Sequence, residues 1–220
     1  LVMSISGLAL VFFLIFHGCM NLALVFSEEA YNTICRLLGA NWYALVGTLG
    51  LAFLVLVHFS YGIYLTIQNR AARGNDKYAV RGKKEGVDWA SENMLVLGFV
   101  VIGFIVLHLY NFWYKMQFAE IIGVQTGMFD PHNGAAFVKD LFTTKISGQI
   151  YCGLYLVWLV ALWFHLNHGV WSAMHTMGLN NLKWEKRTKV TGCVVATIAV
   201  LPFAVVVLYY LGMGIRMLCA

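Results

Sequence analysis

Charged residues are scarce in this chain of 220 residues, at 11%, whereas an average soluble domain has about 25%. Hydrophobic residues make up 60%, whereas an average soluble domain has about 45–50%. Such a chain has too little charge to cover a water-soluble surface and too much apolar surface to stay disordered. The composition therefore predicts an integral membrane protein, and it excludes a nucleic-acid-binding module even though the net charge is +5.

Cysteine motifs are also missing. The five cysteines form no C-x-x-C or C-x-x-C-H pattern; they are Cys19, Cys35, Cys152, Cys193 and Cys219. This excludes a zinc ribbon, a vicinal redox pair and a covalently attached c-type haem. An odd number of scattered cysteines on apolar segments indicates packing rather than a disulfide framework.

The sequence does contain long runs of apolar residues. A helix needs about 20 mostly apolar residues to cross a bilayer, and five runs qualify: 1–26, 42–67, 92–116, 147–173 and 190–215. The first run is too long for a cleaved signal peptide and has no basic region before it. We therefore expect one membrane domain over 1–220, an all-α antiparallel bundle of five transmembrane helices.

Basic residues gather in two of the expected loops, 68–91 and 174–189. They hold ten of the fifteen lysines and arginines: Arg70, Arg73, Lys77, Arg81, Lys83, Lys84, Lys183, Lys186, Arg187 and Lys189. The positive-inside rule predicts that these loops face the cytoplasm. The N-terminus is then cytoplasmic and the C-terminus outside, and the loops could bind a partner protein as well as anionic lipid.

Each of the first four expected spans carries a histidine near mid-depth: His17, His58, His108 and His165. Counted from the span ends at 1.5 Å per residue, they form two level pairs about 15 Å apart, His17 with His108 and His58 with His165. A lone membrane histidine more often bonds a neighbouring helix than a metal. Two facing pairs instead favour two bis-histidine haems, because zinc prefers four ligands close together.

A short repeat accompanies one pair. His58 and His165 are each followed by a glycine at i+4 (Gly62, Gly169) and an aromatic residue at i+6. Position i+4 lies on the same helix face, so a glycine leaves room there for a flat macrocycle; close helix packing is the alternative. His168 competes with His165 as the fourth ligand.

The chain resembles the dihaem cytochrome b membrane subunit of succinate dehydrogenases and quinol:fumarate reductases, in the five-span type similar to members from Bacteroidetes-like anaerobes. The matching stretches are FFLIFHGCMNL, VLVHFSYGIYL, IVLHLYNFW and WFHLNHGVWSAMHTMG. The resemblance implies that His58 and His165 bind the proximal haem b and that His17 and His108 bind the distal one. It also implies an iron–sulfur subunit and a flavoprotein as partners, menaquinone or menaquinol as the quinone, a bacterial inner membrane, and a possible dimer of heterotrimers.

One position departs from a subset of that family. A glutamate thought to conduct protons stands there two residues before the fourth ligand, and this chain has Trp163. The quinone site should lie near the distal haem, with Glu28, Glu29, Tyr31, Asn111, Trp113 and His132 as candidates. Two other functions stay open: a dihaem subunit of another quinone-linked respiratory enzyme, and a transporter or channel that uses the histidines.

Overall fold

The computed structural model describes residues 1–73, 89–179, 181 and 183–219. Four of the basic residues that we used to assign the cytoplasmic side, Lys77, Arg81, Lys83 and Lys84, lie outside the described residues.

Five helices are long and apolar enough to cross a membrane, which confirms the five expected spans. They are α1 (Val2–Phe26), α3 (Trp42–Arg73), α5 (Met94–His108), α8 (Lys145–Thr176) and α9 (Glu185–Cys219). The third span continues beyond α5 through a π-helix, η1 (Leu109–Phe118), and a last turn, α6 (Ala119–Ile122). Helices form here because a backbone in hydrocarbon must satisfy every N–H and C=O within its own segment.

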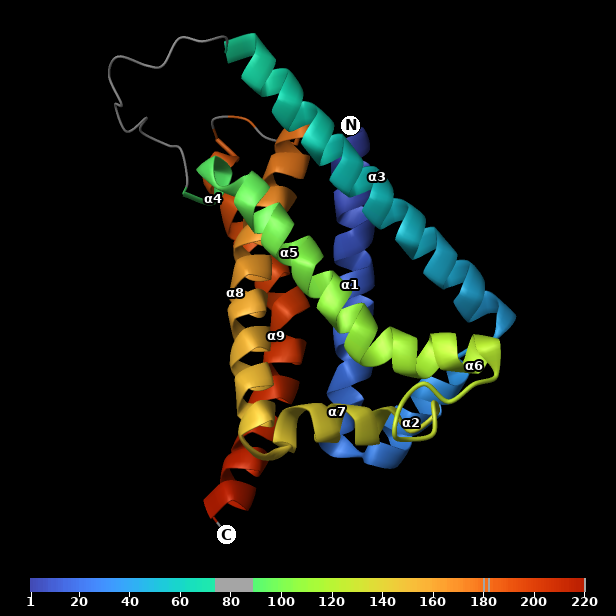
Figure 1. The fold of residues 1–220 in the computed structure, drawn as a ribbon. Coiled ribbons are helices and arrows are strands. Elements are labelled where there is room, and N and C mark those ends of the chain that lie inside the picture. The colour runs from blue at the N-terminus through green and yellow to red at the C-terminus, as the bar shows by residue number, and fades with distance from the viewer. Residues whose placement is uncertain (74–88, 180, 182, 220) are drawn as a thin grey trace.

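The two chain ends lie at opposite ends of the bundle, as an odd number of spans requires (Figure 1). The N-terminus shares its end with the short helix α4 (Trp89–Glu92) and with the turn between α8 and α9. The C-terminal end carries α2 (Glu28–Leu37) and α7 (Gly134–Thr143). We refer to these as the N-terminal end and the C-terminal end of the bundle.

The segments between the first and second and between the third and fourth expected spans, 27–41 and 117–146, also contain helices. Ser27 caps α2 by accepting a hydrogen bond from the Ala30 N–H, and Asn133 caps α7 by accepting one from the Ala136 N–H. Such caps satisfy free amides at a helix start. A count of apolar residues misses these helices because each is only 10 residues long.

Helices α8 and α9 pack side by side, and α1 and α7 pack against them. Small residues at the contact let the helices approach closely, which is how packing stabilises membrane helices. Ala196 and Ala199 are fully buried, and a Cβ at Gly192 would lie 2.8 Å from the Asn167 carbonyl oxygen. This contact forms the most densely packed part of the bundle.

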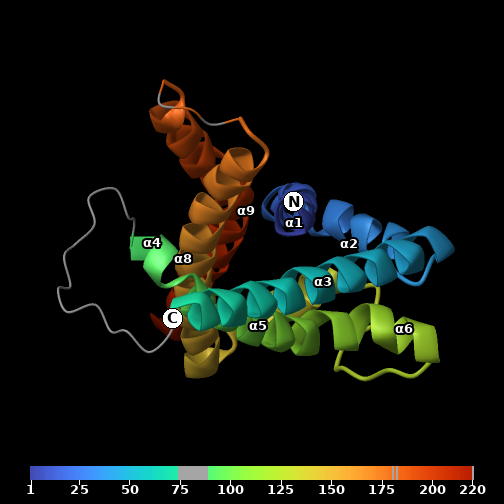
Figure 2. The same ribbon diagram turned by 90° about the horizontal axis from the view of Figure 1, so that it is seen from above.

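Helices α3 and α5 diverge from that core (Figures 1 and 2). Helix α3 packs mainly against α1 and only lightly against α5. No residue in the most apolar window of α3 is buried. Its exposed side chains, such as Leu49, Phe53 and Leu56, suit a hydrocarbon solvent.

Candidate functional site: two facing histidine pairs

His17 of α1 and His108 of α5 face each other, with ring centres 5.9 Å apart and ring planes at 83°. The sequence places them 91 positions apart, and the fold brings them together. Aromatic rings surround the pair: Phe13 and Phe203 lie against His17, and Phe112 and Trp158 lie against His108. Such a shell keeps water away from the imidazoles.

His58 of α3 and His165 of α8 form the second pair, with ring centres 6.3 Å apart and ring planes at 71°. This pair lies toward the N-terminal end, whereas His17 lies farther along α1. His58 contacts α1 at Ser6. Ser6 and His17 are both on α1, and at 1.5 Å per residue they are about 16 Å apart along the helix. The histidines therefore occupy two levels of the bundle.

Both pairs have the separation that two ligands of one metal would show. A metal–imidazole nitrogen bond is about 2.0 Å long, and ring bonds of about 1.33 Å place each nitrogen about 1.1 Å from the ring centre. Two imidazoles bonded end-on to one metal thus have centres about 6.2 Å apart. The distances of 5.9 and 6.3 Å lie near this value, within the range of about 4.5–7 Å for edge-to-face ring pairs in general.

The helices of each pair are held apart. In the described part of the chain, α1 and α5 are at most lightly packed together, and so are α3 and α8. No group of three or more His, Cys, Asp or Glu among those residues could hold a metal ion. An iron that brings its own porphyrin needs only two axial ligands from the protein, so paired histidines on separated helices suit haem b better than zinc.

Two imidazole nitrogens in these pairs are buried without a partner. Nδ1 of His108 and Nδ1 of His165 accept or donate no hydrogen bond to any described residue. A buried polar atom without a partner is costly in a core that serves packing alone. Each of these two rings therefore has one nitrogen that no described residue satisfies.

The other two histidines have polar neighbours that the sequence analysis did not single out. Nδ1 of His58 lies 3.1 Å from Oγ of Ser6, and Nδ1 of His17 lies 3.3 Å from Nδ2 of Asn21. Asn21 follows His17 at i+4, a spacing that the sequence displays. Ser6 is 52 positions from His58, and no sequence signal connects the two.

The two glycines of the repeat have different surroundings. A Cβ at Gly62 would lie 3.2 Å from Cε of Met3, so close packing against α1 accounts for this glycine. A Cβ at Gly169 would meet no other described atom within 4 Å, which leaves space beside α8. Contact of either glycine with a haem stays a prediction.

His168 and Trp163 point to other neighbours. The ring of His168 lies against Trp171, with centres 5.6 Å apart, while His165 is the residue that faces His58. Trp163 donates a hydrogen bond from Nε1 to Oγ1 of Thr197 at 3.0 Å and so joins α8 to α9. The geometry therefore favours His165 over His168 as the partner of His58.

Polar residues near the C-terminal end form a network around η1. Oε1 of Gln117 accepts from Thr48 at 2.9 Å and from Trp113 at 2.8 Å, and Nε2 donates to the Gly39 carbonyl at 2.8 Å. Asn111, also in η1, is buried and donates to the Tyr155 hydroxyl at 3.1 Å. A π-helix is rare and often marks a functional site.

The remaining quinone candidates lie at the same end. Nε2 of His132 lies 3.3 Å from Glu120, and Nδ1 lies 3.1 Å from Asp130. Hydrogen bonds to His132 hold the pKa of Asp130 below its usual value. Tyr31 is buried, which raises the pKa of its hydroxyl, and it donates to Oδ1 of Asn21 at 3.3 Å. Glu120 was missed because nothing in its sequence neighbourhood marks it.

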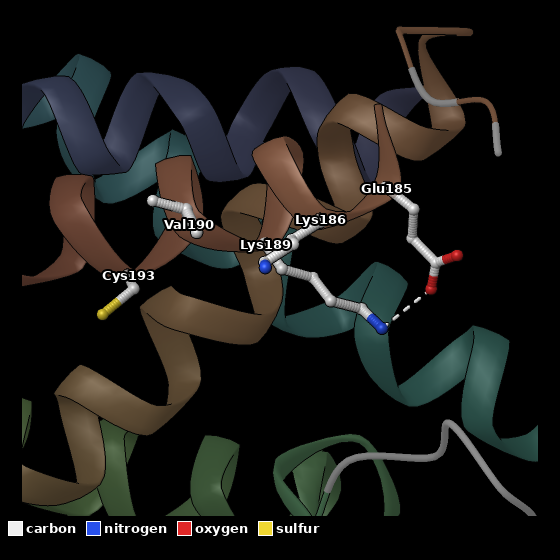
Figure 3. A pocket seen from close by; sticks show the side chains of 5 residues that line it. All are labelled: Glu185, Lys186, Lys189, Val190 and Cys193. Carbon is white, nitrogen blue, oxygen red and sulfur yellow. Dashed lines mark hydrogen bonds and ion pairs between the residues drawn. The ribbon is translucent and has the colours of Figure 1, made fainter. Parts of the chain in front are cut away.

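A shallow hollow lies at the start of α9 (Figure 3). It is lined by Glu185, Lys186, Lys189, Val190 and Cys193, and Lys189 donates a hydrogen bond to Glu185, one turn earlier on α9, at 2.8 Å. None of the four paired histidines lines it. We therefore assign this hollow no part in cofactor binding.

Residues 1–107 match the model of a protein family described as succinate dehydrogenase/fumarate reductase transmembrane subunit. The match includes His17 and His58 and ends one residue before His108. No curated protein and no solved structure matches the chain. Of the three functions considered above, the match favours the first. Over residues 1–107 the chain is therefore similar to succinate dehydrogenase/fumarate reductase transmembrane subunits.

Proposed function

We propose that this chain is the membrane anchor and electron-transfer subunit of a quinol:fumarate reductase or succinate:quinone oxidoreductase. The observation that carries the proposal is the pair of facing imidazoles at each of two levels, His17 with His108 and His58 with His165. Chemistry on fumarate and succinate then belongs to a flavoprotein partner, which an iron–sulfur subunit connects to this chain.

The four histidines would hold two haems b, one at each level. When bound, the haems supply one-electron transfer between a quinone at one face of the membrane and the iron–sulfur subunit at the other. The chain contributes neutral imidazoles, aromatic rings that exclude water, and helices that hold each pair apart. The burial of the imidazoles and the hydrogen bonds to them would set the reduction potentials of the two haem irons.

The two ends of the bundle would serve different partners. Lys183 in the turn between α8 and α9, and Lys186 and Arg187 in the first turn of α9, are exposed. This basic end would dock the iron–sulfur subunit on the cytoplasmic side of a bacterial inner membrane. The network at the opposite end, around η1 and His132, would bind menaquinone or menaquinol beside the His17–His108 pair. The full assembly would be a heterotrimer that can pair into a dimer.

Haem content tests the proposal. The purified chain should contain two b haems per polypeptide, measured as the pyridine haemochrome. His58→Ala and His165→Ala should each lose one haem, because each removes one of the two imidazoles that would hold it. His168→Ala is the matched control and should keep both, since its ring faces Trp171.

A colourless wild-type chain would refute the proposal. Loss of one haem from His168→Ala together with retention of both in His165→Ala would refute the ligand assignment. Identification of the soluble proteins that purify with the chain tests the partner assignment, and a flavoprotein with fumarate or succinate activity is expected among them.

A further inference from the structure

Ser6 is a buried polar residue of α1 that stands beside one of the paired histidines. Its side chain lies in the interior, with 3% of the residue exposed, and its Oγ is 3.1 Å from Nδ1 of His58. The same oxygen lies 2.9 Å from the Val2 carbonyl and 3.2 Å from the Met3 carbonyl. Serine therefore contacts three polar groups with one hydroxyl.

The direction of these bonds follows from counting hydrogens. A hydroxyl has one hydrogen, and carbonyl oxygens can only accept. When Ser6 donates its hydrogen to the Val2 carbonyl, its nearest partner at 2.9 Å, Oγ is left to accept, and the hydrogen in the bond to His58 comes from the imidazole Nδ1. In neutral imidazole only one nitrogen is protonated, so Nε2 of His58 carries the lone pair.

Gly7 completes this arrangement. A Cβ there would lie 3.1 Å from Cε1 of His58, closer than most real Cβ contacts. The glycine thus lets the imidazole approach α1 closely enough to reach Ser6. Positions 6 and 7 act together, one by accepting a hydrogen bond and the other by leaving space.

His17 has the opposite kind of neighbour. Asn21 donates from Nδ2 to the His17 carbonyl at 2.8 Å and accepts at Oδ1 from the Tyr31 hydroxyl at 3.3 Å. These two bonds orient the amide so that its amino group faces Nδ1 of His17. The amino group of Asn21 already donates to the His17 carbonyl and offers no acceptor to Nδ1 of His17, whereas Oγ of Ser6 offers an acceptor to Nδ1 of His58.

We propose that Ser6 is a positioning residue that fixes the tautomer of His58 and makes the two metal sites electronically unequal. The inference rests on the proposed function and deepens it. An acceptor at Nδ1–H makes Nε2 a stronger electron donor, which favours ferric over ferrous iron and lowers the reduction potential of the site. Helix α1, through Ser6, would therefore lower the potential at the His58–His165 level alone.

Redox titration of the complete complex tests this role. Ser6→Ala should raise the midpoint potential of one haem and leave the other unchanged, because alanine removes the acceptor. We expect the equilibrium constant for reduction to rise by up to about tenfold, which is about 59 mV for a one-electron couple. The affected haem should be the one that His58→Ala removes. The ferric low-spin EPR signal of that haem should move as well.

Two variants serve as controls. Ser6→Thr keeps the hydroxyl and should keep both potentials near those of the wild type. Ser60→Ala makes the same chemical change two residues from His58, at an exposed position of α3, and should change neither potential. If Ser6→Ala loses one haem while Ser60→Ala keeps both, Ser6→Cys should retain two haems and show a smaller shift in the same direction, because sulfur is a weak acceptor.

Unchanged potentials and EPR signals in a Ser6→Ala complex that holds two haems would overturn the inference. So would an equal shift in Ser60→Ala, or a Ser6→Cys complex without a shift where Ser6→Ala cannot be titrated. These results differ from failure of the proposed function, in which the wild-type complex itself contains no haem.

Discussion

The side chains of Gln117 and Gln149 differ in their hydrogen-bond partners. The amide of Gln117 is saturated: it accepts from Thr48 and Trp113 and donates to the carbonyls of Leu38 and Gly39. Both amide atoms of Gln149 are buried and have no partner in the described part of the chain. The cost of removing a buried polar group depends on the partners that it leaves behind.

A matched pair of glutamine-to-leucine variants tests this difference. Gln117→Leu should lower the free energy of unfolding by about 1–3 kcal/mol, because the Gly39 carbonyl and the Trp113 N–H lose their partner. Gln149→Leu should be neutral or stabilising, since it removes an unsatisfied amide. Thermal unfolding in one detergent, followed by circular dichroism, measures both. Equal destabilisation by the two variants would contradict this account.

At the level of helices, the contact between α8 and α9 depends on a glycine. Position 192 faces the backbone of Asn167, and a carbonyl oxygen cannot turn away as a flexible side chain can. Gly212 lies on the same helix and has open space around its Cβ position. Two glycines of α9 thus provide a test of packing against intrinsic helix propensity.

Gly192→Ala should destabilise the bundle by about 1–3 kcal/mol through overpacking. Alanine forms helix better than glycine by up to about 1 kcal/mol, so Gly212→Ala should be neutral or stabilising. The midpoint of thermal aggregation in detergent compares the two variants with the wild type. A drop for Gly212→Ala as large as that for Gly192→Ala would show that the close contact is not the cause.

For the whole molecule, the distribution of basic residues and the five spans together predict which end faces the cytoplasm. Lys183, in the turn between α8 and α9, and Asp130, between α6 and α7, are both exposed and lie at opposite ends of the bundle. Each can carry a cysteine without disturbing a buried contact.

A membrane-impermeant maleimide should therefore distinguish the two positions. Asp130→Cys should react in cells whose outer barrier is opened, and Lys183→Cys should react only in inside-out vesicles, because the positive-inside rule places it in the cytoplasm. The wild-type chain, labelled in parallel, corrects for its five native cysteines. The reverse pattern would invert the topology and move the expected docking face to the other side.

The apolar runs determined the number of spans because crossing a bilayer constrains length and polarity so strongly that neighbouring residues suffice. The distance of each histidine from the end of its span also pairs His17 with His108 and His58 with His165, because the rise per residue fixes the height of a residue along a helix. The short helices α2 and α7 lie outside those runs, because their beginnings are marked by the capping residues Ser27 and Asn133 and not by a long apolar segment.

Only the tertiary structure decided which groups stand beside each imidazole. Height along a helix says nothing of rotation or tilt, so the contact of Ser6 with His58 and the tight approach at Gly7 depend on how α1 meets α3. The same applies to Gly62, which faces Met3, and to Gly169, which faces open space, although both occur in one repeated motif. Whether a segment spans the membrane depends on its own residues, whereas the surroundings of a side chain depend on helices that are distant in sequence.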